Sequence, residues 1–228
     1  MNSPHEPAAR DARKTRLFWL ALLELLLMGA AVWLDVLVPS LVIILIGVLL
    51  SLLRRERLAP DGPVFRRPGK GRLILTLLGW AVVWTAVEYA LILPLQNHLL
   101  AETRHVDAFA QVRGNLPALL LLLLLSWTLA AVAEEFAFRG LMRRRIISLF
   151  DNPAIGVVVA VVATSALFGL LHAEQGPVGV AVTAIDGVFF SWIRRRYQSV
   201  WASVLVHGFL NTIGLVAFYF AGPLYGLW

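Results

Sequence analysis

The sequence predicts an all-α fold, a polytopic bundle of membrane-spanning helices. Of its 228 residues, 59% are hydrophobic and only 15% are charged, with a mean hydropathy of +0.77. This apolar share is far above that of ordinary soluble domains. The apolar residues are collected in runs of roughly the 20 residues that a helix needs to cross a bilayer. The polar stretches between the runs are too short to fold around a core of their own, so one membrane-embedded domain remains.

Seven apolar runs predict about seven spans, with an eighth if one of the runs is split or re-entrant. The runs are residues 17–34, 36–53, 73–93, 116–133, 154–171, 178–193 and 200–221. Only the neighbourhood of Asp35 and Pro39 separates the first two, which predicts a tight hairpin. The sixth run is short for a complete span. The polar N-terminus, residues 1–16, contains Pro4 and Pro7 and is expected to be a disordered tail.

The positive charges predict the orientation, because Lys and Arg near span ends collect on the cytoplasmic side. With the N-terminus in the cytoplasm, every one of the 20 basic residues except Arg104 and Arg113 falls in a cytoplasmic segment. We therefore expect a multi-pass protein of the cell membrane with a cytoplasmic N-terminus. The basic runs are loop-sized signals that contact lipid headgroups. They are neither interleaved with aromatic residues nor gathered in one domain, so no nucleic-acid partner is expected.

The chemistry of the chain has to come from residues other than cysteine, because the sequence contains none. Disulfides, thiolate nucleophiles and cysteine-based metal sites are thereby excluded. Ionisable side chains inside membrane spans are costly and are therefore functional candidates. These candidates are Glu24, Glu88, Glu134, Glu135, Arg139, Asp186 and His207, with His172 at the end of a span.

The most informative cluster is Glu134, Glu135 and Arg139. Glu135 and Arg139 are four residues apart, with the acid first, which is the favourable order for an ion pair on one helix. Glu134 is rotated from Glu135 by ~100° on a helix and so lies off that pair. A partly desolvated carboxylate binds a proton more readily, which suits a general base near neutral pH. The alternative is that both acids lie at the water interface and end the span.

Two further pairs have the same four-residue spacing. Phe168 and His172 share one helix face, although a histidine at a helix end is more often a capping or snorkelling residue. His207 and Asn211 project side by side from an apolar helix and could donate two hydrogen bonds to one point, as an oxyanion hole requires. The alternative is that they form hydrogen bonds between helices, next to close packing at Gly208 and Gly214.

Together these motifs, Glu-Glu-x-x-x-Arg, Phe-x-x-x-His and His-x-x-x-Asn, resemble those of the CAAX-protease and bacteriocin-processing family (CPBP, or Abi) of intramembrane endopeptidases. The resemblance covers roughly residues 116–221, and it implies an enzyme that hydrolyses a peptide bond in a membrane-associated protein or peptide. It implies Glu134 as the general base, His172 as a residue that positions the water, and His207 with Asn211 as the oxyanion site. Glu135 and Arg139 would be a supporting ion pair. Residues 17–115 would then be N-terminal helices and loops, and residues 222–228 a C-terminal tail.

No cofactor is favoured, but zinc remains an alternative, because Glu134, His172 and His207 could form a three-ligand site with an open position for water. Asparagine is a poor zinc ligand, and the pairing of His207 with Asn211 favours the metal-free mechanism. The sequence has no His-Glu-x-x-His, Gly-x-Ser-x-Gly or Gly-x-Gly-Asp motif. The competing functions are a catalytically silent scaffold or immunity-type protein that binds a partner peptide, and a small transporter.

Glu24, Glu88 and Asp186 are weaker candidates, expected to be hydrogen-bonded structural groups or to line a watery cavity. The depth of the site raises a further question. In a straight up-and-down path, Glu134 and His207 lie near the cytoplasmic face, whereas His172 lies ~27 Å away from it. Either the fifth helix is broken, tilted or deeper than expected, or the path through residues 140–178 is not a simple pass.

Overall fold

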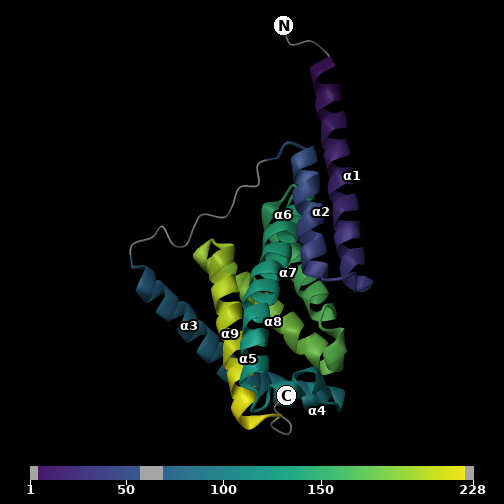
Figure 1. Cartoon of the computed structure of the whole chain (residues 1–228). Helices are drawn as coiled ribbons and strands as arrows, with labels where there is room; N and C mark the ends of the chain where they lie inside the picture. The colour runs from purple at the N-terminus through teal and green to yellow at the C-terminus, as the bar shows by residue number, and fades with distance from the viewer. Residues whose placement is uncertain (1–4, 57–68, 224–228) are drawn as a thin grey trace.

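The computed structural model describes residues 5–56 and 69–223, and all the regular structure in these two ranges is helical (Figure 1). This confirms the predicted fold class. The α-helices are α1 (His5–Trp33), α2 (Pro39–Leu53), α3 (Lys70–Val87), α4 (Leu93–Leu100), α5 (Leu116–Leu125), α6 (Arg143–Ile147), α7 (Pro153–Leu170), α8 (Gly176–Tyr197) and α9 (Val200–Ala221). Two π-helical stretches, η2 (Glu88–Ile92) and η4 (Ser126–Met142), and two short 3₁₀ turns, η3 (Asp107–Val112) and η5 (Ala173–Gln175), complete the described chain.

Each of the seven apolar runs corresponds to one apolar helix. Six helical stretches are long and apolar enough to cross a membrane, and α2 is a shorter seventh. The chain is therefore a multi-pass membrane protein, and the described residues contain no eighth span. Helix α1 begins at His5, so it extends back into most of the segment expected to be disordered, whereas residues 1–4 lie outside the described part.

Three helices are longer than their apolar runs. The third continues through η2 and α4 to Leu100, and the fourth continues through η4 and α6 to Ile147. Helix α8 has 22 residues, so the expectation of a short sixth span is wrong. The reason is that polar residues such as Glu88, Glu135 and Arg139 are buried inside these helices and find partners there, so they do not end them.

The helix starts follow the usual local signals. Proline occupies the first turn of α2, α5, α7 and α8, where its missing N–H costs nothing. Asn115, Asn152 and Ser199 cap α5, α7 and α9, each accepting a hydrogen bond from a backbone N–H of the first turn. These caps set where the helices of the C-terminal half begin.

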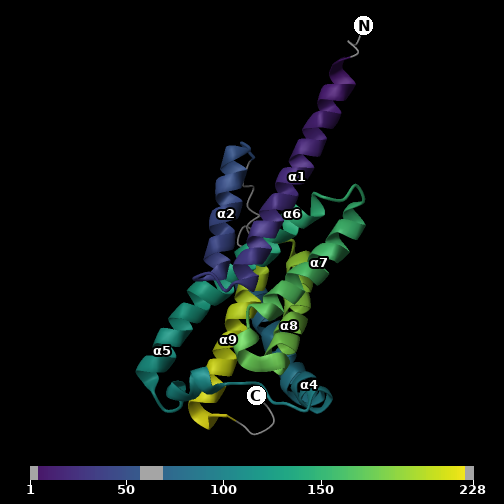
Figure 2. The same cartoon turned by 90° about the vertical axis from the view of Figure 1, so that its right-hand side faces the viewer.

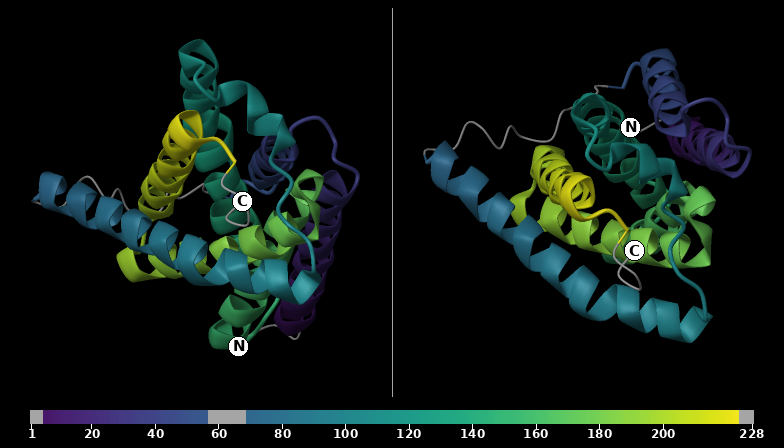
Figure 3. Two further views of the ribbon diagram at one scale, coloured as in Figure 1. Left: turned by 90° about the horizontal axis from the view of Figure 1, so that it is seen from below. Right: turned by 60° about the horizontal axis from the view of Figure 1, so that its bottom comes forward.

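The helices form a bundle whose two ends differ. Helices α1 and α2 form the predicted hairpin and pack against η4 and α6 near one end of the molecule (Figures 1 and 2). Helices α7 and α8 pack closely as a pair, while α9 packs against α3, α8 and η4. The segment that joins α4 to α5 passes across the other end of the bundle, beside the end of α9 (Figure 3).

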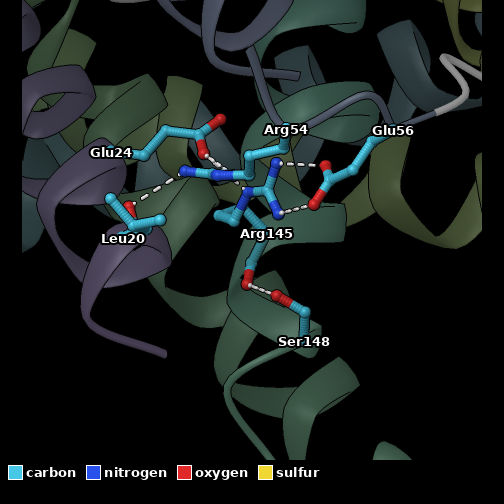
Figure 4. A network of polar contacts seen from close by, with 6 residues as sticks. All are labelled: Leu20, Glu24, Arg54, Glu56, Arg145 and Ser148. Atoms are coloured by element: carbon cyan, nitrogen blue, oxygen red, sulfur yellow. Dashed lines mark hydrogen bonds and ion pairs between the residues drawn. The ribbon is translucent and has the colours of Figure 1, made fainter. Parts of the chain in front are cut away.

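An ion-pair network ties the hairpin to the rest of the bundle (Figure 4). Glu24 of α1 is 2.6 Å from an Arg54 nitrogen and 2.8 Å from Arg145 Nε, and Arg145 also pairs with Glu56 at 2.9 Å. Arg54 donates a further hydrogen bond to the Leu20 carbonyl, and Ser148 donates to that of Arg145. Glu24 is therefore a structural residue that joins α1, α2 and α6. This agrees with the expectation that it is a hydrogen-bonded structural group.

The outer part of this network makes stability depend on pH. The hydrogen bond that Glu56 accepts from Arg145 lowers the pKa of the Glu56 carboxyl below its usual value of 4.5. A lowered pKa in the folded state stabilises the fold above the unfolded-state pKa, and this contribution is lost as the pH falls through the folded-state pKa.

We expect Glu56→Gln to lower the free energy of unfolding by ~0.5–1 kcal/mol at neutral pH, because the pair is partly exposed. The difference from the parent should shrink as the pH falls below 4.5 and the parent carboxyl also becomes protonated. Denaturant unfolding of the purified protein in detergent, with Asp151→Asn as the exposed control, measures both values. A difference that does not change with pH would contradict this role of the Glu56–Arg145 pair.

Candidate active site

The centre of the site is a completely buried ion pair on η4. Glu135 Oε1 lies 3.0 Å from Arg139 Nη1, and both side chains are 0% exposed, which confirms the predicted pair. The guanidinium carbon lies 4.1 Å from the centre of the Phe168 ring, a cation–π contact. A Cβ at Gly187 would lie 3.0 Å from Arg139 Nη2, so a glycine lets α8 approach the pair closely.

His207 of α9 is attached to the same carboxylate. Its Nδ1 is 3.1 Å from Glu135 Oε1, and its ring stacks on Phe190 with centroids 4.6 Å apart. Gly208 beside it is packed against Trp127, because a Cβ there would lie 2.5 Å from the indole ring. The expected close packing is thus present at Gly208, whereas at Gly214 the nearest atom to such a Cβ is 3.9 Å away.

The carboxylate partner also fixes the proton on the His207 ring. Because Glu135 accepts at Nδ1, that nitrogen carries the proton, and Nε2 of a neutral ring is an acceptor. His207 and Asn211 are expected to act as two neutral hydrogen-bond donors, and this expectation changes for His207. With Nδ1 bonded to Glu135, His207 donates from Nε2 only as an imidazolium.

His172 reaches the site from the end of α7. Its Nδ1 donates to the Phe168 carbonyl at 3.0 Å, which leaves Nε2 as an acceptor. Phe168 links the motifs, because its ring contacts Arg139, His172 and His207. The second motif therefore packs directly against the first and the third.

This convergence corrects the expected depths. The helix that carries Glu134 continues for more than a dozen residues to Ile147, so Glu134 lies roughly 20 Å from the turn before α7 and not near the cytoplasmic face. Helix α7 then runs back over a similar length before it reaches His172. The straight path that separated His172 from the other residues is wrong because it ended the fourth span at residue 133.

His172, His207 and Asn211 share the wall of one cavity of about 250 Å³. Glu134 is not on this wall. It is partly buried on η4, within electrostatic range of His207 and Glu135, and its Oε2 is buried without a hydrogen-bond partner. The structure thus brings three of the four expected catalytic residues to one cavity and leaves the fourth beside His207 with a free oxygen.

The cavity extends from the motif residues toward the end of the bundle that carries few basic residues. Its wall includes Arg104, Val106 and Phe109, which belong to the segment between α4 and α5 (Figure 3). It also includes Gly214 and Phe218 near the end of α9. From the charge distribution, we expect this end of the bundle to face away from the cytoplasm.

Sequence reasoning gave too little weight to some of the cavity residues. Glu88 and Asp186, the weaker candidates, both lie on the cavity wall, and Trp84 Nε1 donates to Asp186 at 2.7 Å. Arg104 and Gln175 were not singled out, although Arg104 Nε donates to Gln175 at 2.7 Å beside the cavity. Arg104 could have been noticed as one of the two basic residues outside the cytoplasmic segments.

A preformed metal-ligand set is not apparent at these positions. Within residues 5–56 and 69–223, no three His, Asp or Glu side chains are grouped so that they could hold a metal ion. The donors considered for zinc, Glu134, His172 and His207, are included in this statement. The site is best described as a polar cavity lined by imidazole, amide and carboxyl groups.

The comparisons with known proteins concern the same half of the chain. Residues 116–213 match the family model described as type II CAAX prenyl endopeptidase Rce1-like. No curated protein and no solved structure matches the chain. The matched segment contains all three motifs and most of the helices that form the cavity. Over this segment, the chain is similar to the Rce1-like type II CAAX prenyl endopeptidases.

Proposed function

We propose that this protein is an intramembrane endopeptidase that hydrolyses a peptide bond of a membrane-associated protein with a water molecule activated by Glu134. The observation that carries the proposal is the convergence of His172, His207 and Asn211 on one cavity next to the buried Glu135–Arg139 pair. Binding of a partner peptide alone would require neither an unpaired carboxyl oxygen nor this set of imidazole and amide groups.

Glu134 is the better base of the two adjacent glutamates. Glu135 Oε1 contacts both Arg139 and His207, so Glu135 is committed to holding these two side chains, although its Oε2 is, like that of Glu134, without a hydrogen-bond partner. Glu134 Oε2 has no hydrogen-bond partner and can accept a proton from water. His172 Nε2, on the cavity wall, is available as a second acceptor for water, because Nδ1 is bonded to the Phe168 carbonyl. The proposed mechanism requires the Glu134 carboxyl to reach this water from its position beside the cavity.

The reaction then follows with balanced protons. The water oxygen attacks the peptide carbonyl carbon while its proton moves to Glu134. The carbonyl oxygen becomes an oxyanion that accepts hydrogen bonds from the Asn211 amide and from Nε2–H of protonated His207. The proton on Glu134 passes to the leaving nitrogen as the C–N bond breaks. The products are a carboxylic acid and an amine, which become a carboxylate and an ammonium when the acid proton passes to the amine, and no covalent acyl-enzyme forms.

The extent of the cavity also indicates from which end of the bundle the substrate enters. Because its wall continues to Arg104, Val106 and Phe109, a peptide reaches the site from the end formed by the segment between α4 and α5. This replaces the cytoplasmic access that the straight path favoured. The basic ends of α1, α2, α6 and α8 lie at the opposite end of the spans.

The first test of this function is cleavage of a panel of membrane-anchored peptides by the protein in lipid vesicles. We expect Glu134→Gln to lower the rate by about 10²–10⁴-fold, the usual contribution of a general base. Asn211→Ala should lower it by about 10²–10³-fold through loss of an oxyanion donor. Glu56→Gln, at the other end of the bundle, is the matched control and should cleave at the parental rate.

A zinc chelator separates the two mechanisms in the same assay. Under the proposed mechanism the parental rate is unchanged by the chelator, whereas inhibition that zinc reverses would make Glu134, His172 and His207 metal ligands. Full activity of Glu134→Gln would remove the role of Glu134. Peptide binding without cleavage by the parent would favour the scaffold.

The side of entry can be tested by labelling, because the chain has no cysteine of its own. Gly214→Cys places a thiol on the cavity wall where a Cβ meets nothing closer than 3.9 Å. We expect a membrane-impermeant maleimide to label it in intact cells and not from the cytoplasmic side of inverted vesicles. Arg55→Cys, exposed at the end of α2, should show the reverse pattern. Labelling of both positions from the same side would refute this entry route.

A further inference from the structure

A second polar cluster lies on the wall of the same cavity, apart from the family motifs. It consists of Glu88 on η2 and Asp186 on α8, which are 2% and 7% exposed. Their carboxyl groups are close enough to interact electrostatically, although they come from distant parts of the chain. Two buried acids on one cavity wall are costly in their ionised form unless positive charge or hydrogen-bond donors compensate for them.

The protein supplies only part of that compensation. Asp186 accepts the Trp84 indole N–H at 2.7 Å. Arg104 Nη1 is 3.7 Å from Glu88 Oε1, which is longer than a hydrogen bond, and its Nε is engaged by Gln175. Glu88 Oε2 is buried and accepts no hydrogen bond. Arg139 and His207 are also within electrostatic range of Asp186, but both are already engaged by Glu135. Arg104 is therefore the cation nearest to Glu88, and one oxygen of Glu88 lacks a donor.

The position of the cluster indicates what supplies the missing charge. The cavity that contains Glu88 and Asp186 also contains His172, His207 and Asn211, so a peptide bound at the motif residues can send a side chain to the two acids. An ammonium offers three donors and a guanidinium five, together with one positive charge. These are the features that the cluster lacks.

We propose that Glu88 and Asp186 form a subsite for a basic side chain, lysine or arginine, of the peptide substrate. The identity of this ligand as part of the substrate rests on the proposed endopeptidase function, whereas the affinity of the cavity for an organic cation does not. Glu88 lies outside the segment that matches the family and Asp186 lies inside it, so the subsite joins the N-terminal helices to the matched segment.

Binding is tested first with small probes and the whole protein in detergent. Pentylammonium should raise the melting temperature of the parent in a saturable way, and 1-hexanol, its neutral analogue, should not. The isosteric double variant Glu88→Gln and Asp186→Asn should weaken the apparent affinity at least tenfold. Glu102→Gln, at a partly exposed acid of the same end that does not lie on the cavity wall, is the matched control and should bind as the parent does.

The variant Arg104→Gln should change the affinity for the probe in the opposite direction. Because Arg104 is the cation that partly neutralises Glu88, its removal should tighten pentylammonium binding. No binding to the parent, equal binding of the alcohol, or unchanged binding in the double variant would each overturn the subsite.

Cleavage of a diverse peptide library, read by mass spectrometry, then links the subsite to the substrate. The parent should favour Lys or Arg at one fixed position from the cleaved bond, and the double variant should lose this preference while it still cleaves neutral peptides. If the parent binds pentylammonium but cleaves no peptide, the result would count against the endopeptidase function. The site for an organic cation would still be supported. Cleavage with no basic preference would overturn the assignment to the substrate.

Discussion

The buried ion pair between Glu135 and Arg139 is the interaction on which the rest of the site depends. Two completely buried charges in a membrane protein remain only if each satisfies the other, and removal of one partner from such a pair typically costs ~3–5 kcal/mol. The pair lies at the meeting point of η4, α7, α8 and α9, because Phe168, Phe190, Gly187 and His207 all pack around it. It therefore fixes the relative positions of the helices that carry the three motifs.

The chemistry of the cavity follows from this arrangement. Glu135 Oε1 contacts Arg139 and His207, so Glu135 orients the histidine. The Oε2 atoms of both Glu134 and Glu135 have no hydrogen-bond partner, and what separates the two residues is that Glu135 holds this ion pair. Phe168 packs on Arg139 and both histidines and thus holds the polar groups in an apolar frame. The π-helical form of η4 accompanies this packing, in keeping with the frequent occurrence of such turns at functional sites.

Much of the fold could be predicted from the sequence because apolar runs of span length leave few alternatives. The Glu135–Arg139 pair also followed from spacing alone. The predicted positions of the span ends were wrong. Glu134 was placed near the cytoplasm because polar residues that are in fact buried were taken as the end of a helix. Hydrogen-bond partners could not be predicted from the sequence either, because the Nδ1 contact of His207 and the position of Arg104 beside Glu88 depend on residues far apart in the chain. Sequence spacing predicts neighbours on one helix, but not which helices meet.

The most direct test of this account compares the two adjacent glutamates in unfolding. Free energies of unfolding for Glu135→Gln and Glu134→Gln, measured in the same detergent, separate a structural carboxylate from a catalytic one. The account predicts a loss of ~3–5 kcal/mol for Glu135→Gln, which leaves Arg139 buried without a counter-ion. It predicts a change within ~1 kcal/mol for Glu134→Gln, whose Oε2 has no hydrogen-bond partner to lose. Equal losses in the two variants, or a larger loss for Glu134→Gln, would contradict the division of roles between them.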